Sequence, residues 1–510
     1  MNGPLMTRRA VLELVAGAAI TQVPAAKMPS PSTTPSPNTT TSDICSLTAV
    51  EMAQLIRSKK LSSHEVMSAH LAQIERVNPK VNALVTLTAE EALSGASRAD
   101  QTQARGVSLG PLHGLPIAHK DLVDTAGVRT TYGSLIYTDN VPKQDAMIAE
   151  YTKNAGAISV GKTNTPEFGA GSQTFNRVFG ATLNPYDLTK TCGGSSGGAA
   201  VSLACCMVPI ADGSDSGGSL RNPAAFCGVV GLRVAPGRVP TPAKGNAWST
   251  IAVDGPMARN VPDVALFLSA IAGPDTRCPI SITEPGSQFA GQLGRNFKDV
   301  RVAWFKDMGG IPFQPEILRL VNQQRKVFEE LGCVVEEAEP DWTGVHEAYD
   351  TLRAWGYAEF LGEDVRQHRD LIKDTIIWEV ERGSKLTGAD ISRALGLRSQ
   401  AWERMRVFQE KYEYFITPTT QVAPFAVTEP YPVEINGVRM STYIEWMKSC
   451  ILISALENPA ISVPCGFTES NLPVGLQIVG RHRSEWSVLQ LAYAFEEATP
   501  SARRKPTIAA

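Results

Sequence analysis

The sequence predicts an α/β fold in which a large, mixed and mainly parallel twisted sheet is covered by helices on both faces. Apolar strand segments alternate with helical ones, as in the strand GLPIAHKD (114–121), the helical stretch 145–154 and the strand AISVGKTN (157–164). The chain has 510 residues, of which 43% are hydrophobic and 19% are charged, enough apolar surface to bury a large core. We therefore expect one large folded domain.

The segments on either side complete the predicted order of elements. Apolar residues recur at helical spacing from about Ser46, and Ser62 with Glu65 forms a capping box for a helix that we expect to end at Pro79. The part at about 300–450 is more helical and rich in aromatic residues, and we expect it to be the more variable part of the domain. A final pair of strands, NPAISVPCG and PVGLQIVG, closes the chain.

The N-terminus has the pattern of an export signal followed by a tether. Residues 1–27 carry Arg8 and Arg9, then about a dozen mostly apolar residues and a few small ones, which is typical of a signal peptide of the twin-arginine type. Residues 28–45 are rich in Pro, Ser and Thr and are expected to be a linker, so the folded domain is predicted at 46–505. We expect an exported protein, periplasmic or secreted, with no stable membrane span. The alternative is an amphipathic helix at the unprocessed N-terminus of a cytosolic protein.

Charge and cysteine content exclude several classes of function. The net charge of −3 leaves no excess of basic residues to bind the phosphates of a nucleic acid. The nine cysteines include no CxxC pair and the seven histidines lack metal-ligand spacing, so we expect no metal and no cofactor. The expected partner is a small-molecule substrate, and the chain is expected to be a monomer or a homodimer.

Two short motifs suggest other enzymes. GAISVGKT (156–163) fits the phosphate-loop pattern, but its β-branched residues favour a strand, and a proline and a glycine follow where a helix should begin. GGSSG (193–197) fits the nucleophile elbow of α/β-hydrolases and would make Ser195 the nucleophile. That interpretation requires a downstream histidine such as His482, which we interpret as a solvated residue of a charged turn. It also leaves the serine-rich segment GSDSGGS unexplained.

A lysine at the end of an apolar strand offers a base that is not a histidine. Lys120 ends the strand in HGLPIAHKDLVDTAG, where a charged side chain would be out of place. A buried lysine can stay neutral and accept a proton from a serine hydroxyl, which by itself is a weak nucleophile. A lone lysine at a strand end is usually a surface residue, so this interpretation depends on the two Gly/Ser-rich segments, GGSSGG and GSDSGGS.

These segments resemble the amidase signature family. The resemblance runs through GPLHGLPIAHKDLVDTAGVRTTYGS and GKTNTPEFGAGSQTFN to the long Gly/Ser-rich block from TCGGSSGG to APGRV, and weaker similarity extends over 46–498. It implies a Ser-Ser-Lys triad in which Lys120 is the base, Ser195 is the bridging serine that relays the proton and Ser219 is the nucleophile. It also implies a cis peptide bond before Ser195.

The loop that precedes Ser219 is suited to binding an oxyanion. The consecutive amides of DSGGS can converge on one oxygen, because glycine lets the backbone approach a substrate closely. The predicted oxyanion-hole residues are Ser216, Gly217, Gly218 and Ser219. Ser216 departs mildly from the family, in which threonine, isoleucine or methionine is common. We expect Ser196, Asp215 and Arg221 to hold this loop in place through hydrogen bonds.

The reaction that the resemblance implies is hydrolysis of a carboxylic amide to an acid and an amine, through an acyl-enzyme on Ser219. Aromatic clusters in WTGVHEAYDTLRAWGYAEF, TIIWEVERG and STYIEWMKSC favour a bulky apolar or aryl amide, with esters and carbamates as possible side substrates. Three alternatives stay open. They are the A-type subunit of an amidotransferase, a GxSxG α/β-hydrolase and a catalytically inactive binding protein.

Overall fold

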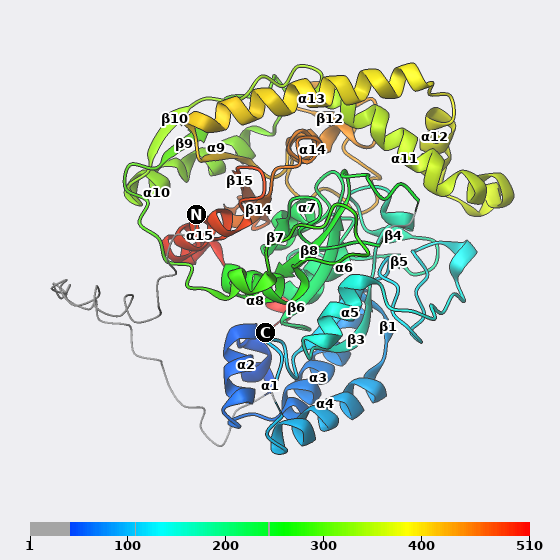
Figure 1. Cartoon of the computed structure of the whole chain (residues 1–510), viewed down its shortest axis with the longest axis vertical. Helices are drawn as coiled ribbons and strands as arrows, with labels where there is room; N and C mark the ends of the chain where they lie inside the picture. Colours follow the sequence, from blue (N-terminus) through cyan, green and yellow to red (C-terminus); the bar gives the residue numbers. More distant parts are fainter. Residues whose placement is uncertain (1–40, 108, 243–244, 510) are drawn as a thin grey trace, which may run out of the picture. The chain divides into compact units, whose positions relative to one another are not determined.

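The central feature of the fold is one large sheet. The structure is a computed structural model that describes residues 41–107, 109–242 and 245–509. Within these residues, eleven strands form the sheet shown in Figure 1, in the order β1-β3-β2-β6-β8-β7-β14-β15-β11-β9-β10. Their bounds are β1 Leu84–Leu87, β2 Pro116–Lys120, β3 Ile158–Thr163, β6 Ile210–Asp215, β7 Val230–Arg233, β8 Val253–Ala258, β9 Arg301–Trp304, β10 Val334–Glu337, β11 Tyr414–Pro418, β14 Ala460–Phe467 and β15 Pro473–Gly480. Two short pairs stand apart, β4 (Phe175–Asn176) with β5 (Gly180–Ala181) and β12 (Glu434–Ile435) with β13 (Val438–Arg439).

The predicted large mixed sheet is confirmed, and its parallel pairs fall into two groups. β3, β2 and β6 pair in parallel in one half, and β11, β9 and β10 in the other. The strands between these groups pair antiparallel, as β1 does with β3 at one edge. The predicted closing strand pair is the antiparallel hairpin of β14 and β15, whose connection is too short for a parallel crossover.

Helices cover both faces of this sheet, as predicted. Alternate residues of β2 and β6 belong to two separate hydrophobic clusters, because successive side chains of a strand point to opposite faces. Ile117 and Ile210 pack on one face in a cluster that includes α8 (Val261–Ile271). Ala118 and Ala211 pack on the other face with α6 (Gly197–Ala204). Lys120 ends β2, the first predicted serine segment leads into α6, and the second one follows β6.

The part at 300–450 is mostly helical, as expected, although it also supplies β9, β10 and β11. Its longest helices, α11 (Val345–His368) and α13 (Gly388–Lys411), pack together, and α12 (Asp374–Gly383) and α14 (Lys448–Ala455) pack on α11, as Figure 1 shows. The remaining α-helices are α1 Thr41–Ser46, α2 Ala49–Arg57, α3 Ser63–Val81, α4 Ala89–Ala104, α5 Met147–Asn154, α7 Arg221–Cys227, α9 Pro315–Gln323, α10 Arg325–Glu330 and α15 Glu485–Ala498.

The folded domain extends beyond the predicted range, 46–505, at both ends. The expected linker reaches residue 45, yet α1 starts at Thr41, and Ile44 and Cys45 are buried in the core. At the other end the carbonyl of Ala509 accepts hydrogen bonds from Gln73 and Arg76, so the fold extends past residue 505. The predicted signal peptide and the rest of the linker lie outside the described residues.

One helix boundary also differs from the prediction. The capping box of Ser62 and Glu65 starts α3 as expected, with each side chain bonded to the other residue's backbone N–H. Pro79 does not end the helix, because it lies in the last turn, where its missing N–H removes a single bond. The helix continues to Val81 and stops at Asn82, which adopts the left-handed conformation.

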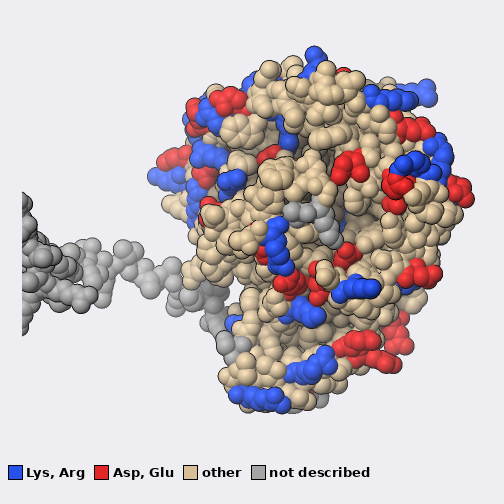
Figure 2. All heavy atoms as spheres, turned by 45° about the vertical axis from the view of Figure 1, so that its right-hand side comes forward, with Lys and Arg blue, Asp and Glu red and all other residues tan. Residues whose placement is uncertain are grey.

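Several surface and core properties complete the description. All nine cysteines are buried and free. No helix in the described part of the chain is both long and apolar enough to cross a membrane. On the face shown in Figure 2, acidic and basic side chains are intermixed, so this face has no broad basic area of the kind that binds nucleic acid.

Candidate active site

Lys120 lies at the centre of the site. It ends β2, its side chain is fully buried, and its Nζ lies 2.7 Å from Oγ of Ser195, 3.0 Å from Oγ of Ser196 and 3.0 Å from Oγ of Ser214. The predicted contact between the lysine and the first serine segment is therefore present. Ser214 was not predicted from the sequence. It is the fifth residue of β6, which pairs in parallel with β2. A serine near the end of the strand beside the one that carries Lys120 was the signal that could have identified it.

The surroundings of Lys120 favour its neutral form. Burial lowers the pKa of Lys120 to about 7, although the nearby carboxyls of Asp254, Asp212 and Asp215 act in the opposite direction. A lysine with a pKa near 7 is neutral in about half of the molecules at neutral pH. The side chain can then accept a proton from Ser195, as the sequence analysis required.

A buried carboxylate fixes the backbone at the end of β2. Asp212 on β6 accepts a hydrogen bond of 2.7 Å from the backbone N–H of Lys120, and its other oxygen is bonded to the ring of His119. Both contacts join β2 to its parallel neighbour β6 where Lys120 leaves the sheet. The direction of the Lys120 side chain is therefore set by two buried strands.

The first serine segment, GGSSGG (193–198), packs closely against Thr174 and is bonded to the second serine segment. The peptide bond between Gly194 and Ser195 is cis, as the resemblance implied. A Cβ at Gly194 would lie 2.9 Å from Oγ1 of Thr174, so only glycine fits this position without displacement. Ser196, at the start of α6, donates its backbone N–H to the carbonyl of Ser219 at 3.2 Å. This bond brings the two serine segments together.

The second serine segment follows β6 and leads into α7. Ser219 is 9% exposed and lines the same cavity as Ser195. The prediction that four amides form the oxyanion hole needs one correction, because the N–H of Gly218 donates to Oδ1 of Asp215 at 2.8 Å. Within the described residues, the amides of Ser216, Gly217 and Ser219 have no protein acceptor. These three donors are left for a substrate oxygen.

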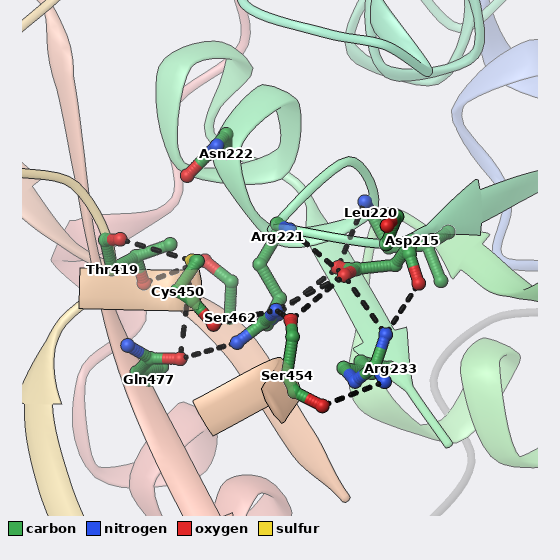
Figure 3. Close-up of polar contacts among 12 residues, drawn as sticks. Asp215, Leu220, Arg221, Asn222, Arg233, Thr419, Cys450, Ser454, Ser462 and Gln477 are labelled. Atoms are coloured by element: carbon green, nitrogen blue, oxygen red, sulfur yellow. Dashed lines mark hydrogen bonds and ion pairs between the residues drawn. The ribbon is translucent and has the colours of Figure 1, made fainter. Parts of the chain in front are cut away.

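A buried ion cluster supports this loop, as Figure 3 shows. Asp215 accepts bonds of 3.0 Å from both Nε and Nη2 of Arg221, the two residues that we expected to hold this loop in place. Arg233 on β7 adds a contact of 3.2 Å that the sequence analysis missed. Burial would raise the pKa of Asp215, but the two guanidinium charges outweigh burial and hold it well below its usual range. Arg221 also bonds Ser454 and Gln477, which anchors the loop to α14 and β15.

The triad serines open into a cavity of about 600 Å³ with a largely apolar wall. The aromatic residues that line it are Phe168, Trp248, Tyr349, Trp355, Tyr357 and Phe360. Four of them come from α11, in the first of the three predicted aromatic clusters. The third cluster contributes Met447, while its Trp446 packs in the core against Phe226, and the second cluster does not reach the wall.

Neither rival motif has the surroundings that its pattern requires, although Ser195 of GGSSG does lie in the catalytic cavity. The segment GAISVGKT forms β3, and Lys162 is buried with its Nζ bonded to Thr125 and Val123. No histidine is found among the described residues that line the cavity. His482 is half-buried beside Trp402, which corrects its interpretation as a fully solvated residue. The described residues also include no group of three or more His, Cys, Asp or Glu side chains placed to hold a metal ion.

This fold, with a buried lysine at the end of β2 bonded to serines at the start of α6 and on β6, is typical of hydrolases in which lysine takes the place of histidine. The family model for amidases matches residues 65–489. An acylamidase from Rhodococcus erythropolis is 36% identical over 463 residues, which cover 90% of this chain and 97% of the relative. The A-type subunit of the glutamyl-tRNA(Gln) amidotransferase from Moorella thermoacetica is also 36% identical, over 91% of this chain and 98% of the relative.

Solved structures agree with these matches. A bacterial aryl acylamidase of the amidase signature enzymes superposes with a TM-score of 0.84 at 28% identity, covering 89% of this chain and 96% of that one. A 6-aminohexanoate cyclic dimer hydrolase superposes with a TM-score of 0.83 at 25% identity, covering 92% and 100%. The chain belongs to the amidase signature family and is a hydrolase of carbon–nitrogen bonds.

Proposed function

We propose that this enzyme hydrolyses a carboxylic amide through an acyl-enzyme on Ser219. The hydroxyl of Ser219 attacks the amide carbon while its proton passes to Ser195, and the proton of Ser195 passes to Lys120. The amides of Ser216, Gly217 and Ser219 stabilise the negative oxygen that forms. The proton returns through Ser195 to the leaving amine, and the same relay then activates the water that releases the acid.

The observation that carries this proposal is the contact of 2.7 Å between Lys120 and Ser195 inside a buried site. A lysine that is neutral near pH 7 can serve as the base without a histidine, because burial has lowered its pKa. Lys120, Ser195 and Ser219 are all present, and two of them line one cavity, which argues against a catalytically inactive binding protein.

We further propose that the substrate is a bulky apolar or aryl amide. The apolar wall of the cavity favours such a substrate, since burial of apolar surface is worth about 25 cal/mol per Å². The names of two relatives, an acylamidase and an aryl acylamidase, support the same choice. Esters and carbamates are side substrates in this proposal, since the acyl-enzyme chemistry is shared.

The similarity to the A-type subunits of amidotransferases suggests a second candidate function, that of such a subunit, which would act on glutamine. A glutamine-like substrate carries charges that a site must pair. The two arginines of the cavity wall, Arg353 and Arg398, are already paired with Glu379 and Glu457. This pairing favours an uncharged amide.

A panel of substrates tests the proposed function. The purified enzyme is assayed with anilides, primary amides, peptide amides, carbamates and glutamine, with Ser219→Ala as the matched control. We expect the highest kcat/KM among the anilides or other bulky apolar amides and no turnover by the control. Glutamine as the best substrate, or no hydrolysis of any amide, would contradict the proposal.

We also propose that the enzyme is exported, with residues 1–27 as a twin-arginine signal peptide. The support is the sequence pattern, in which Arg8 and Arg9 precede an apolar stretch and a group of small residues.

A further inference from the structure

Phe168 lines the catalytic cavity in a backbone conformation that bulky residues rarely adopt. Its φ is 49° and its ψ is 23°, in the left-handed region. Such a conformation is unfavourable for a bulky side chain and persists only where the surroundings enforce it. A strained aromatic residue in a catalytic cavity points to a role for the position of its ring.

The surroundings of Phe168 tie it to the strand that carries the lysine. Its backbone N–H donates to the carbonyl of Tyr132 at 2.8 Å, and the N–H of Tyr132 donates to the carbonyl of Asp121 at 3.0 Å. Asp121 directly follows Lys120. Tyr132 has a positive φ of 53° as well, so two aromatic residues are held in this conformation.

The ring of Phe168 is the cavity end of a group of three aromatic rings. It is stacked on Tyr132 at 6.4 Å between centroids and meets Tyr137 edge-on at 6.0 Å. Tyr132 and Tyr137 meet edge-on at 5.1 Å. Offset stacking and edge-to-face contacts of this kind are favourable, so the Phe168 ring is held in place and not free to rotate away.

The position of Phe168 relative to Ser195 identifies which part of a substrate it meets. A Cβ at the next residue, Gly169, would lie 3.4 Å from Oγ of Ser195 and 3.0 Å from Leu122. Phe168 therefore directly precedes the residue that lies beside the relay serine, and its own side chain lines the cavity into which that serine opens. The oxyanion loop faces another element, since Oη of Tyr349 on α11 lies 3.4 Å from Oγ of Ser216.

We propose that Phe168 determines the specificity for the leaving group by binding an aromatic amine, so that the preferred substrates are anilides. The inference rests on the proposed function, in which Ser195 returns the proton to the leaving amine and must therefore lie next to it. The aryl ring of the amine packs on Phe168, while the acyl group extends toward the aromatic residues of α11.

The test compares amides that share one acyl group and differ in the amine. Anilide, N-cyclohexyl amide and primary amide are assayed with wild type, Phe168→Leu and Phe168→Tyr. Phe360→Leu is the matched control, because it removes an aromatic ring from the cavity wall on α11. For Phe168→Leu we expect kcat/KM for the anilide to fall about tenfold relative to the primary amide, the effect expected for one aromatic pair.

The other variants separate this role from general damage. Phe168→Tyr keeps the ring and is expected to retain the preference for the anilide, while Phe360→Leu leaves the ratio of anilide to primary amide unchanged. An equal loss on all three substrates in Phe168→Leu, or the same selective loss in Phe360→Leu, would overturn the inference. A wild type that prefers the primary amide to the anilide would also overturn it while leaving amide hydrolysis intact. A wild type without any amidase activity would instead remove the proposed function.

Discussion

Replacing the buried lysine should make the enzyme more stable at neutral pH while abolishing its activity. Lys120→Met keeps a side chain of similar length but has no charge to desolvate. In the folded protein burial lowers the pKa of Lys120 to about 7, whereas an unfolded lysine keeps a pKa of 10.5. Between about pH 7 and pH 10.5 the unfolded chain therefore binds more protons than the folded one, and the stability of the wild type rises with pH over this range.

The size of the effect follows from these two pKa values. The pKa difference corresponds to about 4 kcal/mol of lost stability at pH 7 and about 1 kcal/mol at pH 9.5. Removing the amine leaves the hydroxyls of Ser195, Ser196 and Ser214 without this hydrogen-bond partner. Each lost hydrogen bond lowers the stability of the variant by about 1 kcal/mol. Lys120→Met should therefore be about 1 to 2 kcal/mol more stable than wild type at pH 7 and less stable by a similar amount at pH 9.5.

Urea unfolding at both pH values measures this reversal, and kcat/KM measured against pH gives the second readout. Wild-type kcat/KM should rise with pH along a limb centred near 7, and Lys120→Arg should be nearly inactive because guanidinium stays protonated. Lys162→Met is the matched control, since this second buried lysine does not line the cavity and its loss should leave the pH limb in place. A stability difference between wild type and Lys120→Met that is the same at pH 7 and pH 9.5 would refute the reasoning.

Three further predictions concern the loop, the signal and the base. Asp215→Asn should lower the free energy of unfolding by about 3 to 5 kcal/mol in urea at pH 7, because two buried guanidinium groups lose their counter-charge; a loss below about 1 kcal/mol would show that the cluster behaves like an exposed ion pair. Changing Arg8 and Arg9 to lysine should keep the enzyme in the cytoplasm, and unchanged periplasmic or secreted activity would rule out the twin-arginine route. His482→Ala and an excess of chelator should each leave kcat/KM unchanged, and a large loss in either experiment would point to a histidine or metal mechanism.

The parts of the fold and the site that the sequence predicts well are set by residues that lie close together along the chain. The capping box of Ser62 and Glu65 is a local signal, and the helix starts where that signal places it. β2 is likewise a short apolar run with Lys120 at its end, and the lysine is buried, as its combination with the two serine segments indicated. The resemblance of the lysine segment and the two serine segments to the amidase signature grouped them into one site.

The parts that were missed depend on how distant elements meet. Arg233 reaches Asp215 only because β7 and β6 flank β8 in the sheet, an order that no local pattern encodes. The Gly218 amide is bonded to Asp215 because the loop folds back on β6, so counting the amides in DSGGS overestimated the free donors. Phe168 lies in the segment GKTNTPEFGAGSQTFN, but no local pattern encodes its left-handed backbone or its bond to the distant Tyr132.

Labelling with a fluorophosphonate tests the central assignment, Ser219 as the nucleophile, most directly. The probe reacts with an activated serine, and peptide mapping by mass spectrometry then identifies the modified residue. We predict a single adduct on the peptide that carries Ser219, which disappears in Ser219→Ala together with amide hydrolysis. An adduct on Ser195 together with full activity of Ser219→Ala would contradict the account.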